Sequence, residues 1–182
     1  MTLERLWNGW RAAYVAGHGV DRRLADAVDA DDAELAAASV FTRILRSGLS
    51  DEEAHIVHRS ERCFVIMNAF PYTSGHMLVL PFREVPDLED LDEAETTELW
   101  ATVTDAVRVL KSTYRPQGVN VGINLGESAG GSVSQHLHVH VVPRWTGDAN
   151  FMTTVADTRT LPEAIGHSAA RVREAWIALA AQ

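Results

Sequence analysis

Three histidines at alternate positions, His136, His138 and His140, constrain this sequence more than any other feature. Apolar residues separate them and follow them: Leu137, Val139, Val141 and Val142. Leu and Val at these positions favour a β-strand. Side chains of a strand alternate between its faces, so the three imidazoles are predicted to share one face and the apolar residues the other. A row of groups that titrate near neutral pH indicates chemistry rather than a solvated surface.

This spacing fits a metal site poorly. In a strand, the Cα atoms of His136 and His140 lie about 13 Å apart, whereas zinc needs ligand nitrogens at about 2.0–2.1 Å in a tetrahedron. A catalytic relay fits better. In such a relay the middle histidine attacks or ligates the reacting group, and its neighbours orient it and supply protons. Two alternatives to this relay are that the row binds a metal or that all three histidines have only structural roles.

Three more segments accompany the histidine row. Residues 68–76 read Asn-Ala-Phe-Pro-Tyr-Thr-Ser-Gly-His, residues 124–132 are rich in glycine, and residues 143–152 begin Pro-Arg-Trp. With the row itself, these blocks resemble the histidine triad (HIT) superfamily, in the fragile-histidine-triad-like branch that includes actinobacterial diadenosine tetraphosphate phosphorylases. The resemblance covers roughly residues 39–165.

Composition agrees with a globular enzyme and disfavours several other classes. The chain has 182 residues, 46% hydrophobic and 23% charged, enough for one domain with a core. A net charge of −9 disfavours a nucleic-acid binder. The single cysteine, Cys63, lies in an apolar run and is predicted to be buried. The absence of a signal-peptide pattern and of any apolar run that approaches a membrane span predicts a cytoplasmic protein without membrane contact.

Periodicity and capping signals predict an α+β fold with an antiparallel sheet of about five strands and packed helices. The clearest helix begins at the N-cap Asp92, with Glu95 at the capping-box position, and ends near Arg115. The other expected helices span 3–16, 34–47 and 161–180, and the expected strands include 54–60, 63–68, 77–81, 119–125 and 136–143. We expect one domain over 1–182, made of an N-terminal extension (1–35), a core (36–165) and a C-terminal helix (161–182). The resemblance implies the HIT-like fold and a homodimer or homotetramer.

The resemblance also implies roles for four histidines. His138 is the residue that carries the nucleotidyl group, and a neutral imidazole is a competent nucleophile. His140 is placed to donate a proton to the bridging or leaving phosphate oxygen. His136 orients the strand, and His76 braces the row from the neighbouring strand.

Phosphate contacts are expected from the glycine-rich segment. Glycines let backbone N–H groups approach phosphate oxygens closely. The candidate residues here are Asn124, Gly126, Gly130, Gly131 and Ser132. Ser132 stands where related enzymes carry a longer glutamine, so the acceptor in the reaction can differ.

The remaining candidate contacts concern charge and the nucleoside. Arg144 supplies positive charge or closes the strand, and Trp145 stacks on a base or packs in a dimer interface. By residue match, Ile66 and Leu78 line the base pocket, and Asn68 binds the ribose hydroxyls.

Many HIT proteins carry a structural zinc site, and its ligand positions differ here. Ser39 and Thr42 occupy the cysteine positions, and Glu84 occupies a histidine position. The sequence therefore predicts no bound metal and no required cofactor. Inorganic phosphate is a candidate co-substrate, and a divalent metal can accompany the polyphosphate.

The sequence thus predicts a nucleotidyltransferase or hydrolase that acts through a nucleotidyl-histidine intermediate. Phosphorolysis of diadenosine tetraphosphate to ATP and ADP is the leading reaction. Hydrolysis of dinucleoside polyphosphates or nucleoside phosphoramidates is the alternative within the same chemistry, and a nucleotide-binding regulator with little turnover is the alternative from another class.

Overall fold

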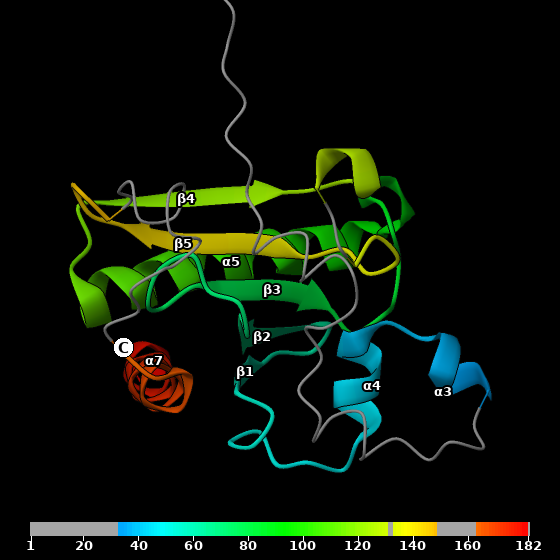
Figure 1. Cartoon of the computed structure of the whole chain (residues 1–182), viewed down its shortest axis with the longest axis horizontal. Coiled ribbons are helices and arrows are strands. Elements are labelled where there is room, and N and C mark those ends of the chain that lie inside the picture. Colours follow the sequence, from blue (N-terminus) through cyan, green and yellow to red (C-terminus); the bar gives the residue numbers. More distant parts are fainter. Residues whose placement is uncertain (1–32, 131–132, 149–162, 182) are drawn as a thin grey trace, which may run out of the picture.

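A computed structural model describes residues 33–130, 133–148 and 163–181. Its centre is an antiparallel sheet with the strand order β1-β2-β3-β5-β4 (Figure 1). The strands are β1 (Ile56–Arg59), β2 (Cys63–Met67), β3 (Met77–Pro81), β4 (Gly118–Ile123) and β5 (Val139–Arg144). The predicted α+β class and the five antiparallel strands are confirmed.

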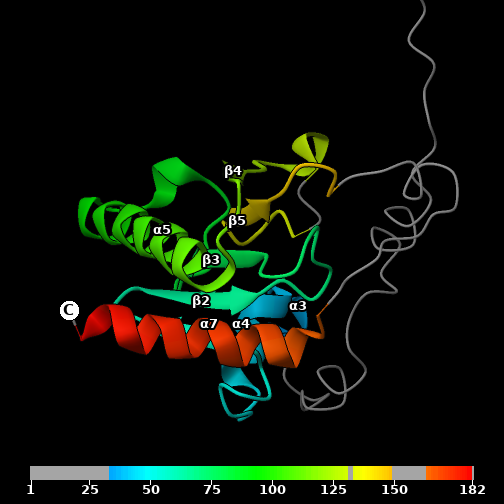
Figure 2. The ribbon, with the colours of Figure 1, turned by 90° about the vertical axis from the view of Figure 1, so that its left-hand side faces the viewer.

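Helices cover both faces of this sheet. On one face lie α5 (Glu93–Tyr114) and α7 (Ile165–Ala180), which contact each other (Figure 2). The shorter helices α3 (Ala33–Ala37) and α4 (Val40–Arg46) follow each other in the chain, and α4 packs on the opposite face. Two 3-10 turns, η2 (Leu88–Asp90) and η3 (Glu127–Ala129), complete the described elements. No helix within the described ranges is long and apolar enough to cross a membrane.

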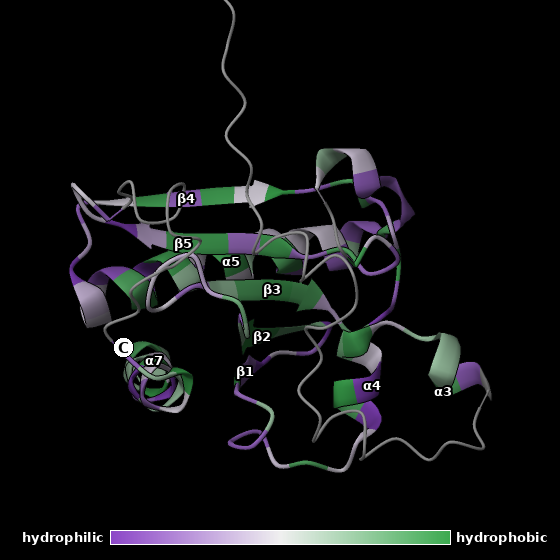
Figure 3. Ribbon diagram, viewed as in Figure 1, coloured by the Kyte–Doolittle hydropathy of each residue, from purple (hydrophilic) through white to green (hydrophobic). Residues whose placement is uncertain are grey.

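The central strands are apolar on both faces, which explains why both faces are covered. Every residue of β2 and β3 is buried, and β3 is hydrophobic along its length (Figure 3). Side chains that alternate along the strands enter two separate apolar clusters. The larger cluster, against α5 and α7, includes Val65, Val79, Leu99, Val139 and Trp176. The smaller cluster, against α4, includes Phe41, Phe64, Ile66, Leu78 and Leu80.

Several predicted boundaries are wrong, for local reasons. The helix expected over 34–47 is two helices, because the Ser39 side chain accepts a hydrogen bond from the Thr42 N–H and caps a new helix there. Strand β5 begins at Val139, three residues later than expected, and the last helix begins at Ile165. The helix expected over 3–16 and most of the extension over 1–35 lie outside the described residues, and the division into domains stays a prediction.

The start of α5 is as predicted. Asp92 accepts a hydrogen bond from the Glu95 N–H at 2.8 Å, and Glu95 accepts one from the Asp92 N–H at 3.0 Å. The Glu95 carboxylate also accepts two hydrogen bonds from Arg83, at 2.9 and 2.6 Å. This arrangement joins the helix start to the segment that leaves β3. The hydrogen bonds from Arg83 lower the pKa of Glu95 to about 2.

We expect Glu95→Ala to lower the free energy of unfolding by about 1–3 kcal/mol at neutral pH, because a cap and a charged hydrogen-bond acceptor are both lost. A carboxyl group whose pKa is lowered in the folded state stabilises above its unfolded pKa of about 4.3. The difference from wild type should therefore shrink as pH falls from about 4.3 towards 2. Urea titrations of both proteins at several pH values measure this difference in the free energy of unfolding. Glu93→Ala, an exposed change in the same helical turn, is the control and should have less than half the effect.

Candidate active site

The three histidines of the row lie on one face, at the N-terminal end of β5. Leu137, Val139 and Val141 point the other way, into the larger apolar cluster. The alternation predicted from the sequence is therefore present, although only His140 belongs to the regular strand. Phe41 of α4 packs against the first two imidazoles, with ring centroids 5.6 Å from His136 and 5.5 Å from His138.

Hydrogen bonding assigns the protonated nitrogen of His138. Its Nδ1 lies 2.8 Å from the backbone carbonyl oxygen of His136. A carbonyl oxygen can only accept, so Nδ1 carries the proton and Nε2 carries the lone pair. Burial lowers the pKa of His138, which favours the neutral ring. His138 is therefore a neutral imidazole with Nε2 ready to attack an electrophile.

A second chain of hydrogen bonds gives His140 the opposite arrangement. The Tyr72 backbone N–H donates to His76 Nδ1 at 3.1 Å, so the His76 proton resides on Nε2. That nitrogen lies 3.0 Å from His140 Nδ1 and donates to it. The His140 proton consequently resides on Nε2, an atom that is buried. The imidazoles of His138 and His140 are neighbours, with ring centroids 5.0 Å apart.

His136 is fully buried, and protein groups hold both of its nitrogens. Nε2 donates to the Pro81 carbonyl oxygen at 2.9 Å, and Nδ1 lies 2.8 Å from the hydroxyl of Ser39. Burial lowers the pKa of this ring as well. Such a residue supports its neighbours and has no surface to offer a substrate.

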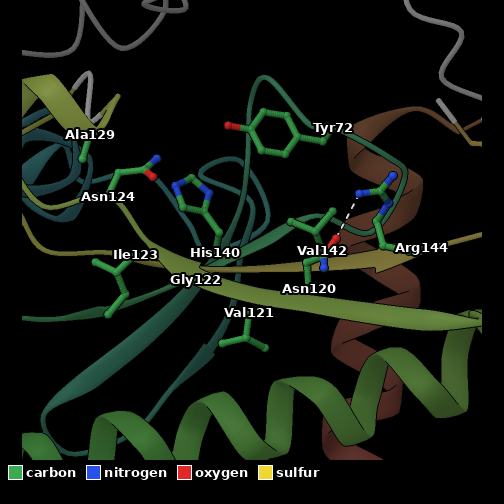
Figure 4. Close-up of a pocket in the computed structure, with 10 residues that line it drawn as sticks. All are labelled: Tyr72, Asn120, Val121, Gly122, Ile123, Asn124, Ala129, His140, Val142 and Arg144. Carbon is green, nitrogen blue, oxygen red and sulfur yellow. Dashed lines mark hydrogen bonds between the residues drawn. The ribbon is translucent and has the colours of Figure 1, made fainter. Parts of the chain in front are cut away.

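A pocket of about 350 Å³ opens beside His140, between β4, β5 and the Tyr72 loop (Figure 4). His140, Asn124 and the Tyr72 ring lie on one side of the two strands, whereas Val121 points to the other side. Gly122 pairs with His140 in the sheet and leaves the space above this strand open. Tyr72, whose amide and ring both contact the histidines, is not among the site residues predicted from the sequence. Its position within the predicted 68–76 segment was the available signal.

The predicted nucleoside contacts lie around the same end of the sheet. The Asn68 side chain accepts a hydrogen bond from the Phe70 N–H at 2.9 Å, and its amide nitrogen lies 3.3 Å from His76 Nδ1. Ile66 and Leu78 are buried in the smaller apolar cluster, with Phe41. Their contacts with a ribose and a base stay predictions.

Position 75, immediately before His76, requires glycine because of its backbone conformation and the space around it. Its φ is +85°, in the left-handed region, and a Cβ here would lie 2.8 Å from Tyr114 Cε2. The Trp145 ring packs edge-on against the same tyrosine, with centroids 6.4 Å apart. This packing within the chain was not among the two roles predicted for Trp145.

Arg144 lines the pocket and is paired with the Asp148 carboxylate, and both of its predicted roles stay predictions. Both of its bonds to Asp148 are 2.6 Å long, and a third bond, 2.9 Å long, reaches the Asn120 side chain. The hydrogen bonds from Arg144 lower the pKa of Asp148 to about 2, so this pair stays ionised and mutually neutralised. The sequence signal for the pairing was the acid four residues after the arginine.

Two glycines of the glycine-rich segment adopt left-handed backbone conformations. Gly126 and Gly130 have φ values of +73° and +94° and flank η3. Asn124 and Ala129 line the pocket, so this segment forms part of its wall. Gly131 and Ser132 lie outside the described residues, and their phosphate contacts stay predictions.

The three residues at the zinc-ligand positions converge on His136 without forming a suitable ligand set. The Glu84 carboxylate accepts hydrogen bonds from the Thr42 hydroxyl and from the Ser39 N–H, at 3.0 Å for the latter. The Ser39 hydroxyl is occupied by His136. Neutral hydroxyls are poor zinc ligands beside thiolate and imidazole. No cluster of three or more His, Cys, Asp or Glu that could hold a metal occurs within the described ranges.

Comparison with known proteins identifies the family. The HIT domain family matches residues 50–147, more than half of the chain, and the chain belongs to this family. A Mycobacterium tuberculosis protein named AP-4-A phosphorylase is 42% identical over 174 residues, covering 96% of this chain and 85% of that protein. A Schizosaccharomyces pombe protein named bis(5'-nucleosyl)-tetraphosphatase [asymmetrical] is 35% identical over 95 residues, covering 52% of each.

The solved structures agree with this assignment. A Zn-bound histidine triad family protein from Mycobacterium smegmatis has a TM-score of 0.64 and 28% identity, covering 79% of this chain and 96% of that one. The predicted HIT-like fold and the prediction of an enzyme of this family are confirmed.

A side chain added at Gly122 tests whether the pocket beside His140 binds the substrate. In Gly122→Val, the new Cβ would meet no described atom within 4 Å, and valine suits a strand, so stability should not fall. Nucleotide affinity, measured by titration calorimetry, should fall at least tenfold because the side chain enters the pocket. Gly118→Ala, on the same strand but outside the pocket lining, is the control. Unchanged affinity in Gly122→Val would place the substrate elsewhere.

Proposed function

We propose that this protein transfers a nucleotidyl group from a dinucleoside polyphosphate, with diadenosine tetraphosphate as the leading substrate and inorganic phosphate as the acceptor. The observation that carries the proposal is the pairing of two adjacent imidazoles with opposite protonation. His138 presents a lone pair at Nε2, and His140 presents a proton at Nε2. A nucleophile beside a hydrogen-bond donor that can stabilise the leaving oxygen is what an attack on phosphorus needs.

In the first step, His138 Nε2 attacks the α-phosphorus of diadenosine tetraphosphate. A P–N bond forms, the bond between the α-phosphorus and its bridging oxygen breaks, and ATP leaves as an anion whose developing charge is stabilised by a hydrogen bond from His140 Nε2–H. The positive charge that develops on the His138 ring is eased by its Nδ1–H bond to the His136 carbonyl. In this proposal the product is an adenylyl group on His138.

In the second step, an oxygen of inorganic phosphate attacks the adenylyl phosphorus. The P–N bond breaks, any proton remaining on the acceptor oxygen is released to solvent, and ADP leaves with His138 restored. Phosphate as the acceptor is supported by the 42% identity to the M. tuberculosis AP-4-A phosphorylase along almost the whole chain. Water as the acceptor would give AMP instead, the outcome that the S. pombe relative's name favours.

Product analysis separates these reactions. We expect diadenosine tetraphosphate with ³²P-labelled inorganic phosphate to give unlabelled ATP and ADP labelled only at its β-phosphate. ATP with AMP, and no incorporated label, would replace phosphorolysis with hydrolysis. Nucleotide binding with no turnover under either condition would favour a regulator.

Substitution of the nucleophile tests the intermediate. We expect His138→Ala to fold and to lower kcat at least 10³-fold, because the covalent route is lost. Wild type quenched early with substrate labelled at the α-phosphate should carry acid-labile, base-stable label on the peptide containing residue 138. His58→Ala is the control, since that imidazole stacks on Trp176, away from the pocket. Label on another residue would contradict this mechanism.

The remaining contacts are part of the same proposal. Asn68 binds the ribose hydroxyls, Ile66 and Leu78 border the base, and the segment Asn124–Ser132 binds phosphate. A divalent ion enters with the polyphosphate, and the protein itself needs no cofactor. Titrations with and without Mg²⁺ measure that dependence.

We further propose a cytoplasmic homodimer or homotetramer. The support is that β4 is an edge strand of the described sheet and carries Val121, which is 42% exposed. Edge strands of this kind offer unpaired backbone groups to another chain. Light scattering coupled to size-exclusion chromatography measures the assembly, and a monomer at all concentrations would refute it.

A further inference from the structure

The nucleophile lies on a segment that the sheet does not hold. Strand β5 begins at Val139, so the ladder bonds to β3 and β4 start one residue after His138. Residues 136–138 are held instead by the Leu137 N–H, which donates to the Val85 carbonyl at 2.7 Å, and by the two nitrogens of His136. The position of the His136 carbonyl, which accepts from His138, therefore depends on how the His136 ring is held.

One side of that ring is held by three residues that we name the Glu84 cluster: Ser39, Thr42 and Glu84. Ser39 is 1% exposed, and its hydroxyl lies 2.8 Å from His136 Nδ1. The same hydroxyl oxygen accepts the Thr42 N–H at 3.1 Å. Glu84 in turn accepts from the Ser39 N–H and the Thr42 hydroxyl.

With His136 neutral, one arrangement of protons serves both partners of its ring, and the 3.2 Å contact between the Ser39 and Thr42 hydroxyl oxygens then carries no proton. His136 must donate from Nε2 to the Pro81 carbonyl, so its Nδ1 must accept. Ser39 then donates its single hydroxyl proton to His136, and Thr42 donates its own to Glu84. The reverse orientation would direct the lone pair of Nε2 at the lone pairs of the Pro81 oxygen. Burial raises the pKa of Glu84, but its hydrogen bonds with Thr42 and Ser39 outweigh this and keep it ionised.

We propose that Ser39 and Glu84 are positioning residues for the nucleophile: they hold His136 so that its carbonyl fixes His138 as the Nδ1–H tautomer. This inference rests on the proposed function. Ser39 and Glu84 touch no reacting atom and act only through His136. Ser39 is the N-cap of α4 and Glu84 lies in the segment after β3, 97 and 52 residues before His136 in the chain, respectively.

The test combines kinetics with the protonation of the rings. In ¹⁵N-histidine-labelled wild type, long-range ¹H–¹⁵N spectra should show a proton on Nε2 of His136 and on Nδ1 of His138. Ser39→Ala removes the donor to His136. We expect its His138 resonances to move to values of mixed tautomers, and kcat for the nucleotide to fall about tenfold with KM within about twofold of wild type.

Two further variants separate positioning from loss of stability. Glu84→Gln keeps the shape and one accepting oxygen, so it should lower kcat by about threefold and shift the same resonances less, and it decides the matter if Ser39→Ala does not fold. Glu98→Gln is the matched control. Glu98 accepts from the Ser60 hydroxyl and from the N–H groups of Arg62 and Cys63, a similar network that makes no hydrogen bond to Ser39 or His136. It should lower stability and leave kcat and the tautomers unchanged.

The outcomes are distinct. Wild-type kcat and unchanged His138 resonances in both Ser39→Ala and Glu84→Gln, or kinetic effects equal to those of Glu98→Gln, would overturn the positioning role. If wild type turns over no dinucleoside polyphosphate, the proposed function fails, while the histidine spectra still test the positioning role directly.

Discussion

The hydrogen bond from His138 Nδ1 to the carbonyl oxygen of His136 is the interaction on which the site depends. It decides which nitrogen of the nucleophile keeps its lone pair, and burial keeps that ring neutral. A hydroxyl or water in place of the carbonyl could donate as well as accept, and the ring could then turn to either tautomer. A backbone carbonyl has no such freedom, which makes it a dependable partner if it is itself held in place.

Helices cover both faces of the sheet, and this arrangement explains how the residues that hold the histidines reach them. Because β2 and β3 bury both faces, α5 and α7 can pack on one face while α4 packs on the other. Phe41 and the Ser39 cap then approach the histidine row from the α4 side. His76, which immediately precedes β3, contacts His140. Each imidazole is thus held by a different part of the chain, and each is held in one tautomer.

Features that depend on local pattern were predictable from the sequence, and features that depend on distant partners were not. Alternation at 136–141 predicts the shared face of the imidazoles, and Asp92 with Glu95 predicts the capping box, because both effects act over a few residues. The break at Ser39 was missed because a long apolar-periodic stretch favours one helix until a capping hydroxyl competes. The pairing of Ser39 with His136 spans 97 residues, and no periodicity encodes it. The spacing of Arg144 and Asp148 is visible in the sequence, but the turn that brings the two side chains into contact is not.

Cys63 illustrates a practical consequence of the buried central strands. It is the only cysteine of the chain, its side chain is inaccessible in β2, and burial raises the pKa of the thiol to about 12. A thiol in this state hardly reacts with alkylating reagents, since the thiolate is the reactive form. Modification therefore requires the strands to separate. The rate of alkylation of the Cys63 sulfur therefore measures how often the central strands open in solution, and no label has to be introduced.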